Sequence, residues 1–193
     1  MIGALPTTLE VNGKAYRIDA DFRNVLEIFV AFNDPDLEDK EKAYICLQRL
    51  YTDFESMPTE DVQAAYEQAA KFLSCNTQDT GKRENRAQLV NWVKDEQLIF
   101  PAINKAAGME IRALPFVHWW TFMGWFQSID RDAVWGTVLT IRQKKSRGKK
   151  LESYEKEFEK ENRELCSVKV LAKAPTPENA LAAIFAELTK GGD

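Results

Sequence analysis

Histidine is almost missing from this sequence, in which His118 is the single histidine among 193 residues. The three cysteines, Cys46, Cys75 and Cys166, are far apart and form no Cys-x-x-Cys pair. One histidine and scattered cysteines indicate neither a zinc site nor a disulfide framework. Phosphate-loop, nucleophile-elbow and dinucleotide-binding patterns are missing as well. We therefore expect no metal, no cofactor and no enzymatic activity.

Long apolar runs are missing too. No stretch approaches the roughly 20 apolar residues of a membrane span, and residues Met1 to Pro6 lack the basic region and apolar run of a signal peptide. We expect a protein that is not secreted, has no membrane segment and works in a reducing cytoplasm. The formal net charge of −4 argues against a general nucleic-acid binder and leaves only a local basic patch for such a role.

What the sequence does contain is enough apolar residues for a core, since 45% are hydrophobic and 29% are charged, as in ordinary globular proteins. The first element is a β-hairpin, in which two alternating segments, Thr8–Val11 and Lys14–Ile18, flank the turn signal Asn12-Gly13. In this register Leu9 lies opposite Tyr16, and one apolar face of the hairpin needs a cover.

Apolar residues at spacings of three and four predict that this cover is helical. The predicted helices run from 21 to the Asp34-Pro35-Asp36 turn and over 37–54, 59–73, 89–107, 115–129, 130–142, 151–164 and 177–190. Thr59 is the expected N-cap of the helix over 59–73. Pro101 should kink or break the helix over 89–107, and Gly108 should end it. Residues 74–86 are expected to form a polar loop. The fold class is mainly α: a helical domain with a short N-terminal β-hairpin. We expect a hairpin and helical core domain over 1–150, and a charged helix and a short C-terminal helix over 151–193 as an appendage.

The segment from His118 to Trp125 carries large apolar residues on two helical faces. Its aromatic residues either all belong to the core or are divided between the core and a partner interface, for which Phe122 and Trp125 are the candidates. His118 has no local catalytic partner and is expected to be a packed, hydrogen-bonded imidazole. We expect these residues to form the structural core: Tyr16, Phe22, Phe116, Trp119, Trp120 and Met123.

A basic run follows between the last helix of the core domain and the charged helix. The plainest interpretation is a solvated loop, and the alternative is a docking patch for an acidic partner, with nucleic acid as a second possibility. No aromatic residue is interleaved, so stacking on single-stranded nucleic acid is not supported. The candidate partner-binding residues of this run are Arg142, Lys144, Lys145, Arg147, Lys149 and Lys150.

Several short sequence blocks occur in a characteristic order along the chain. They are Leu5-Pro6, Gly13-x-x-Tyr16-x-Ile18, Asp21-Phe22-Arg23, Asp95 with Ile99 and Ala102, and His118-Trp119-Trp120-x-Phe122 followed by Arg142. In this order, over about residues 5 to 165, the sequence resembles the gene-product-fifteen family of tailed bacteriophages. It departs from the family at Pro101, where a helix-forming residue is more usual, and the tail from Pro175 to Asp193 has no counterpart.

The resemblance implies a non-enzymatic protein of phage tail morphogenesis that looks like a tail assembly chaperone. Such a protein would bind the tape measure protein while tail tube subunits polymerise, act in the cytoplasm of the infected host, and be absent from the mature virion. Coating a long client would need many copies and hence self-association. Two alternatives stay open: a structural tail or connector component that remains in the virion, and a host-directed or nucleic-acid-binding accessory protein.

Overall fold

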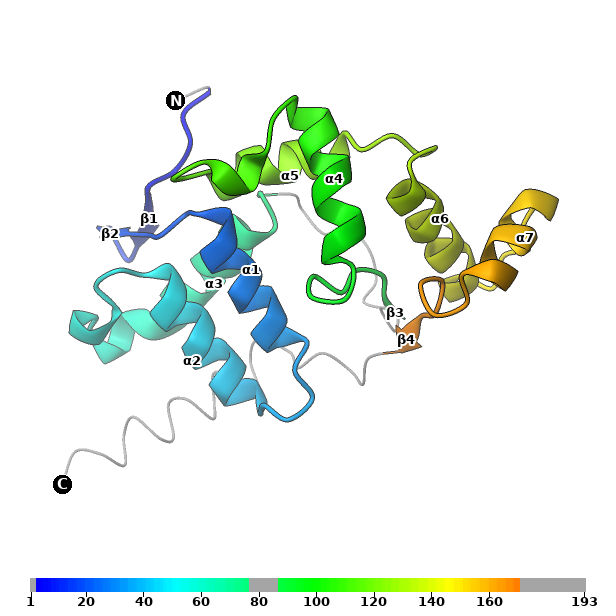
Figure 1. The fold of residues 1–193 in the computed structure, drawn as a ribbon. Coiled ribbons are helices and arrows are strands. Elements are labelled where there is room, and N and C mark those ends of the chain that lie inside the picture. Colours follow the sequence, from blue (N-terminus) through cyan, green and yellow to red (C-terminus); the bar gives the residue numbers. More distant parts are fainter. Residues whose placement is uncertain (1–2, 77–86, 171–193) are drawn as a thin grey trace. The chain divides into compact units, whose positions relative to one another are not determined.

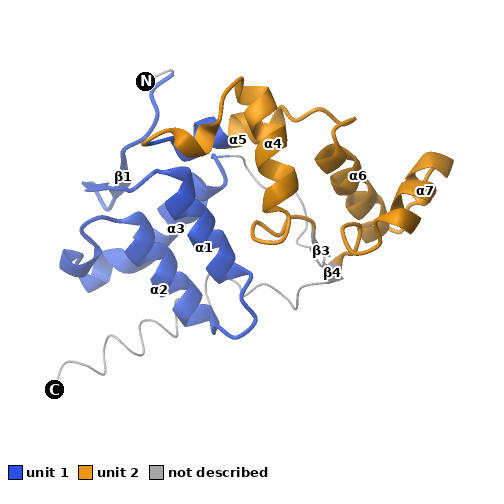
Figure 2. Ribbon diagram, in the orientation of Figure 1, with its two compact units in different colours: residues 1–79, 116–122, 175–193 blue, residues 80–115, 123–174 orange. Residues whose placement is uncertain are grey.

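The computed structural model describes residues 3–76 and 87–170, which form two compact units. The described residues of unit 1 lie within 1–79 and 116–122, and those of unit 2 within 80–115 and 123–174 (Figures 1 and 2). The protein is mainly helical with a small N-terminal hairpin, which confirms the predicted fold class. The division into 1–150 and 151–193 stays a prediction.

The hairpin has the predicted register. Strands β1 (Thr8–Val11) and β2 (Lys14–Arg17) are antiparallel, and Leu9 pairs with Tyr16. Asn12 and Gly13 adopt positive φ angles of 49° and 80°, as a two-residue turn with primed geometry requires. The side chains of Val11 and Tyr16 are buried, so one face of the hairpin is covered.

Helices α1 (Phe22–Phe32), α2 (Asp39–Leu50) and α3 (Val62–Leu73) pack in unit 1, α1 against α2, and α3 against both α2 and β1. The second helix ends four residues earlier than predicted. Tyr51 turns extended because its backbone forms a bridge with Ile18, and its hydroxyl donates to the carbonyl of Ala65 at 2.7 Å. A contact with the hairpin therefore sets this helix end.

The start of α3 also differs from the prediction. Thr59 is not an N-cap, because residues Thr59–Asp61 form a 3-10 turn and the α-helix begins at Val62. The Asp61 carboxylate instead accepts hydrogen bonds from the Tyr16 hydroxyl at 2.5 Å and the Asn12 side chain at 2.8 Å. These bonds from Tyr16 and Asn12 lower the pKa of Asp61, and the bond to Asp61 raises the pKa of Tyr16. Asp61 thus ties the hairpin to α3.

Unit 2 contains α4 (Glu96–Ala107), α6 (Val134–Ser146), α7 (Ser153–Glu161), the 3-10 turn Ile111–Ala113, and the short antiparallel pair β3 (Ala87–Gln88) and β4 (Lys169–Val170). The sequence did not predict this strand pair. Helix α4 begins seven residues later than expected and continues through Pro101 without a break. Gly108 ends it at φ 70°, as predicted.

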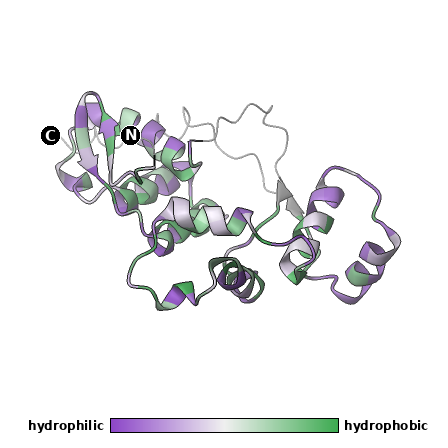
Figure 3. Cartoon of the chain, turned by 90° about the horizontal axis from the view of Figure 1, so that it is seen from above, coloured by the Kyte–Doolittle hydropathy of each residue, from purple (hydrophilic) through white to green (hydrophobic). Residues whose placement is uncertain are grey.

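Helix α5 (Trp119–Gln127) contributes residues 119–122 to unit 1 and 123–127 to unit 2. It was predicted to begin at Pro115. Asp130 was predicted to cap the next helix, whereas the cap of α6 is Ala133 and the helix begins at Val134. In Figure 3 the helices carry both hydrophobic and hydrophilic residues along their length. The predicted helix at 177–190 and most of the predicted 74–86 loop lie outside the described residues. No helix among the described residues is long and apolar enough to span a membrane.

The contact between Asp61 and Tyr16 predicts a pH-dependent stability. Asp61→Asn should lower the melting temperature at neutral pH, because a neutral amide is a weaker acceptor than a carboxylate. Since the folded-state pKa of Asp61 is lowered, its contribution is complete at neutral pH and is lost as the pH falls below about 4, through the folded-state pKa. The melting-temperature gap between wild type and variant, followed by circular dichroism, should therefore close in acid. Asp53→Asn, at an exposed site, is the control, and a gap for Asp61→Asn that does not change with pH would contradict the assignment.

Candidate functional site

The segment before α5 is joined to the segment before α1 by main-chain hydrogen bonds. The Phe22 N–H donates to the Val117 carbonyl at 2.9 Å, and the Trp119 N–H donates to the Ala20 carbonyl at 2.8 Å. The Asp21 carboxylate accepts the Val117 N–H at 3.0 Å and also caps α1 through the Arg23 N–H at 2.9 Å. Val117 and His118 are consequently bound to Asp21 and Phe22, which is why α5 starts at Trp119.

His118 completes this arrangement, which we call the His118 junction (residues 6, 20–22 and 117–120). The imidazole Nδ1 accepts the Trp120 N–H at 3.1 Å, so in the neutral ring Nε2 carries the proton and donates to the Pro6 carbonyl at 3.0 Å. The ring is 4% exposed and lies edge-on to Phe72 and Trp120. Both ring nitrogens are therefore engaged, as expected for a packed imidazole.

Trp119 and Trp120 bind the end of α3. Their indole N–H groups donate to two carbonyls in the last turn of the helix, those of Leu73 at 3.0 Å and Phe72 at 2.9 Å. The Phe72 carbonyl also accepts the Cys75 N–H at 3.0 Å. Trp119 is 1% exposed, whereas Trp120 is half-buried. The tryptophan pair thus joins α5 to α3 by polar as well as apolar contacts.

Two aromatic residues have roles opposite to those expected. Phe122, expected on a partner-binding face, is fully buried and stacks on Phe22 with ring centroids 4.7 Å apart. Phe116, expected in the core, is 53% exposed. The reason is that helical spacing does not apply to Phe116, which lies before the helix. Met123 and Trp125 are half-buried.

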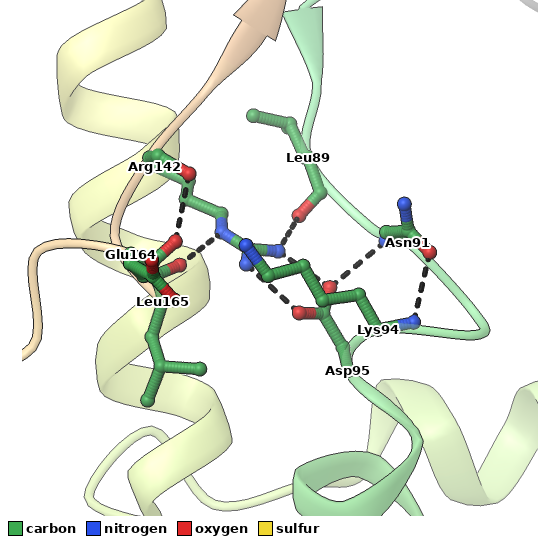
Figure 4. Close-up of polar contacts among 8 residues, drawn as sticks. Leu89, Asn91, Lys94, Asp95, Arg142, Glu164 and Leu165 are labelled. Atoms are coloured by element: carbon green, nitrogen blue, oxygen red, sulfur yellow. Dashed lines mark hydrogen bonds and ion pairs between the residues drawn. The ribbon is translucent and has the colours of Figure 1, made fainter.

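Arg142 forms a buried ion pair with Asp95 inside unit 2 (Figure 4). Its Nη1 and Nη2 donate to the two Asp95 carboxylate oxygens at 2.6 and 2.8 Å, and the two side chains are 4% and 0% exposed. Its Nη1 also donates to the Leu89 carbonyl and its Nε to the Leu165 carbonyl, both at 2.8 Å. Arg142 therefore fixes two loops to α6 and is not available to a partner, which corrects the prediction.

Two further residues of the basic run are neutralised by α7. Lys144 donates to both oxygens of the buried Glu155 at 2.7 Å, and Lys145 pairs with Glu159. Burial raises the pKa of Glu155, but the bonds from Lys144 and the backbone N–H of Glu152 outweigh it and lower this pKa overall, while the pKa of Lys144 is raised by Glu155. Lys144 and Lys145 thus hold α7 on α6 instead of forming a free basic surface.

The remaining basic residues, Arg147, Lys149 and Lys150, are exposed. We call residues 147–150 the basic turn. Gly148 adopts φ 64°, its N–H donates to the Lys145 carbonyl and the Lys149 N–H donates to the Lys144 carbonyl, which is a Schellman motif at the end of α6. No described residue forms an ion pair with these three side chains. The expected docking patch is therefore reduced to the basic turn.

The described residues contain no group of three or more His, Cys, Asp or Glu side chains arranged to hold a metal ion. Sequence reasoning named Asp95 and Arg142 separately but did not pair them. A signal was present, because Arg142 lies on the helical stripe of Trp135 and Val138, where a charge must be buried. The contact of Asp61 with Tyr16 had no such local signal.

The fold and its buried polar clusters define a mainly helical protein whose internal polar groups bind one another. A family model described as Bacteriophage Gp15 protein matches residues 1–166. The chain therefore belongs to this bacteriophage family. No curated protein and no solved structure matches the chain.

The half-burial of Trp120 predicts that the two tryptophans differ in their contribution to stability. Trp119→Ala should lower the free energy of unfolding by about 3–5 kcal/mol, because it leaves a cavity and an unpaired Leu73 carbonyl. Trp120→Ala should cost less, since part of its ring is already in water. Urea denaturation measures both. Equal costs, or a Trp119→Ala variant as stable as wild type, would refute this ordering.

The ion pair predicts a large effect at Arg142. Arg142→Ala should cost about 3–5 kcal/mol because it leaves the Asp95 carboxylate buried and unpaired. Arg142→Lys should not rescue stability, since one ammonium group cannot replace a guanidinium that binds a carboxylate and two carbonyls. The control is Lys105→Ala, which breaks the exposed pair with Asp130 (side chains 74% and 64% exposed) and should cost no more than about 1 kcal/mol in the same urea titration. A small cost at Arg142 would show that the pair is dispensable.

Proposed function

We propose that this protein is a non-enzymatic tail assembly chaperone that binds the phage tape measure protein while the tail tube is built. The observation that carries the proposal is family membership over residues 1–166, most of the chain. The buried clusters agree with it, because His118, Asp95 and Arg142 bind other parts of the protein. These three side chains have structural roles, so we expect a partner to bind exposed side chains instead.

A chaperone for a long amphipathic helix needs exposed apolar side chains that match the apolar face of its client. The described residues with large exposed apolar side chains are Leu5, Val30, Tyr44, Val93, Met109, Phe116, Val134 and Tyr154. Leu5 and Phe116 are 46% and 53% exposed, and the bond between His118 Nε2 and the Pro6 carbonyl joins the segments that carry them. We assign the client contact to this part of unit 1.

On this proposal the protein acts in the cytoplasm of the infected host and is absent from the mature virion. Many copies bind one tape measure chain, and the tail tube protein replaces them as it polymerises. The half-buried Trp125 remains a candidate contact residue in unit 2.

Co-expression with the tape measure protein of the same phage tests the proposal. We expect a soluble complex that copurifies, and a tape measure protein that is insoluble when expressed alone. Leu5→Ser/Phe116→Ser should weaken binding by about tenfold through the loss of two apolar contacts. Val93→Ser/Tyr154→Ser, at exposed sites of unit 2, is the matched control and should bind like wild type.

Absence of a complex, together with an unchanged solubility of the tape measure protein, would reject the chaperone proposal. Loss of binding in the control pair alone would move the contact to unit 2. Mass spectrometry of purified virions gives an independent result, because abundant copies in mature tails would favour a structural tail component instead.

A further inference from the structure

Positive charge is concentrated in one short segment of this chain. Residues 142–150 hold 6 of the 26 Lys and Arg residues and none of the 30 Asp and Glu residues. The rest of the chain therefore has 20 basic and 30 acidic residues, a formal charge of −10. Each copy of the protein thus carries one basic segment and is acidic elsewhere. The basic segment of one copy can therefore attract an acidic surface of another copy.

The basic turn is the part of this segment that is open to another molecule. Arg142, Lys144 and Lys145 are engaged by Asp95, Glu155 and Glu159, so three cations remain. The Schellman motif fixes the backbone of the turn, as described above. A fixed backbone lowers the entropy that a binding loop loses when it is ordered on a partner.

A matching acidic turn joins α1 and α2. We call residues 34–38 the acidic turn. The Asp34 carboxylate accepts the Asp36 N–H at 2.9 Å, and Pro35 between them restricts the backbone. Glu38 pairs with Lys40, but no described residue forms an ion pair with Asp34 or Asp36. Asp36 is exposed, so its carboxylate is open to a cation from another molecule.

We propose that copies of this protein associate head to tail, with the basic turn of one copy bound to the acidic turn of the next. The two surfaces differ, so the contact is heterologous and leaves a free turn at each end of a pair. Such contacts form rings or open chains, and an open chain suits the coating of a long client. The inference goes beyond the proposed function, because it concerns contacts between copies in the absence of any client.

Nucleic acid is the less favoured occupant of the basic turn. Glu152, Glu157 and Glu161 are exposed on or next to α7, which follows the turn directly. They alternate with the exposed Lys156 and Lys160, so α7 does not extend the basic turn into a continuous basic surface for a phosphate backbone. A compact carboxylate pair such as Asp34 and Asp36 needs no more than the three cations of the basic turn.

A charge swap tests the proposal with the full chain. Lys149→Glu/Lys150→Glu makes both turns acidic, and Asp34→Lys/Asp36→Lys makes both turns basic. At low ionic strength, where the Debye length is about 30 Å, wild type should sediment above its 22.1 kDa monomer mass, and it should dissociate when salt shortens that length to about 8 Å. Each variant alone should be monomeric. An equimolar mixture of the two should associate again, because opposite turns then meet.

The control Lys71→Glu/Lys94→Glu changes the same number of exposed lysines elsewhere and should associate like wild type. A monomeric wild type at low salt, variants that associate unchanged, or a mixture that fails to associate would each overturn the proposal. Binding of duplex DNA at low salt that is lost only in Lys149→Glu/Lys150→Glu, with association unchanged, would assign the basic turn to nucleic acid instead. Circular dichroism of each variant shows that the fold is intact.

Discussion

The Asp21 carboxylate connects parts of unit 1 that are far apart in the sequence. One oxygen caps α1 through the Arg23 N–H, and the other accepts the Val117 N–H, 96 residues later in the chain. Holding Val117 extended places the next two residues: His118 reaches the Pro6 carbonyl and Trp119 reaches the end of α3. A charge-assisted bond to a backbone N–H is stronger than a neutral one, so a single carboxylate can fix the start of two helices.

In unit 2 a buried arginine side chain fixes the loops that pack against α6. Arg142 projects from α6 into the interior and binds one carboxylate and two loop carbonyls. Burying an ion pair is costly, and apolar residues often replace one without loss of stability. Here the replacement would also leave the Leu89 and Leu165 carbonyls without donors, because apolar side chains cannot bind them. The ion pair therefore specifies the loop arrangement as well as contributing to stability.

Local patterns predicted what depends on local physics. The Asn12-Gly13 turn determined the hairpin and its register, and Gly108 ended its helix as expected, because backbone conformation alone decides both. Helix ends were predicted less well wherever a distant segment binds the backbone. The bridge to Ile18 holds Tyr51 outside α2, and before α5 the Val117 carbonyl accepts the Phe22 N–H while the Trp119 N–H donates to the Ala20 carbonyl. The exposure of Phe116 follows from that last error, whereas the burial of Phe122 depends on its stacking on Phe22. The burial of Arg142 could be predicted from its place on an apolar helical stripe, but its pairing with Asp95 could not.

The residues by which the chain resembles its family are mostly those that build the interior, and this limits what the family match says about binding. Asp21, His118 and Trp119 are used for internal hydrogen bonds, so their side chains identify the architecture and not a client. On the proposed function, client specificity would come from side chains that the fold leaves exposed. Leu5 combines both properties, because it belongs to a family-like block and stays 46% exposed, next to the proline carbonyl that His118 binds. The bond from His118 to the Pro6 carbonyl thus fixes the backbone next to Leu5, while the Leu5 side chain stays exposed to a partner.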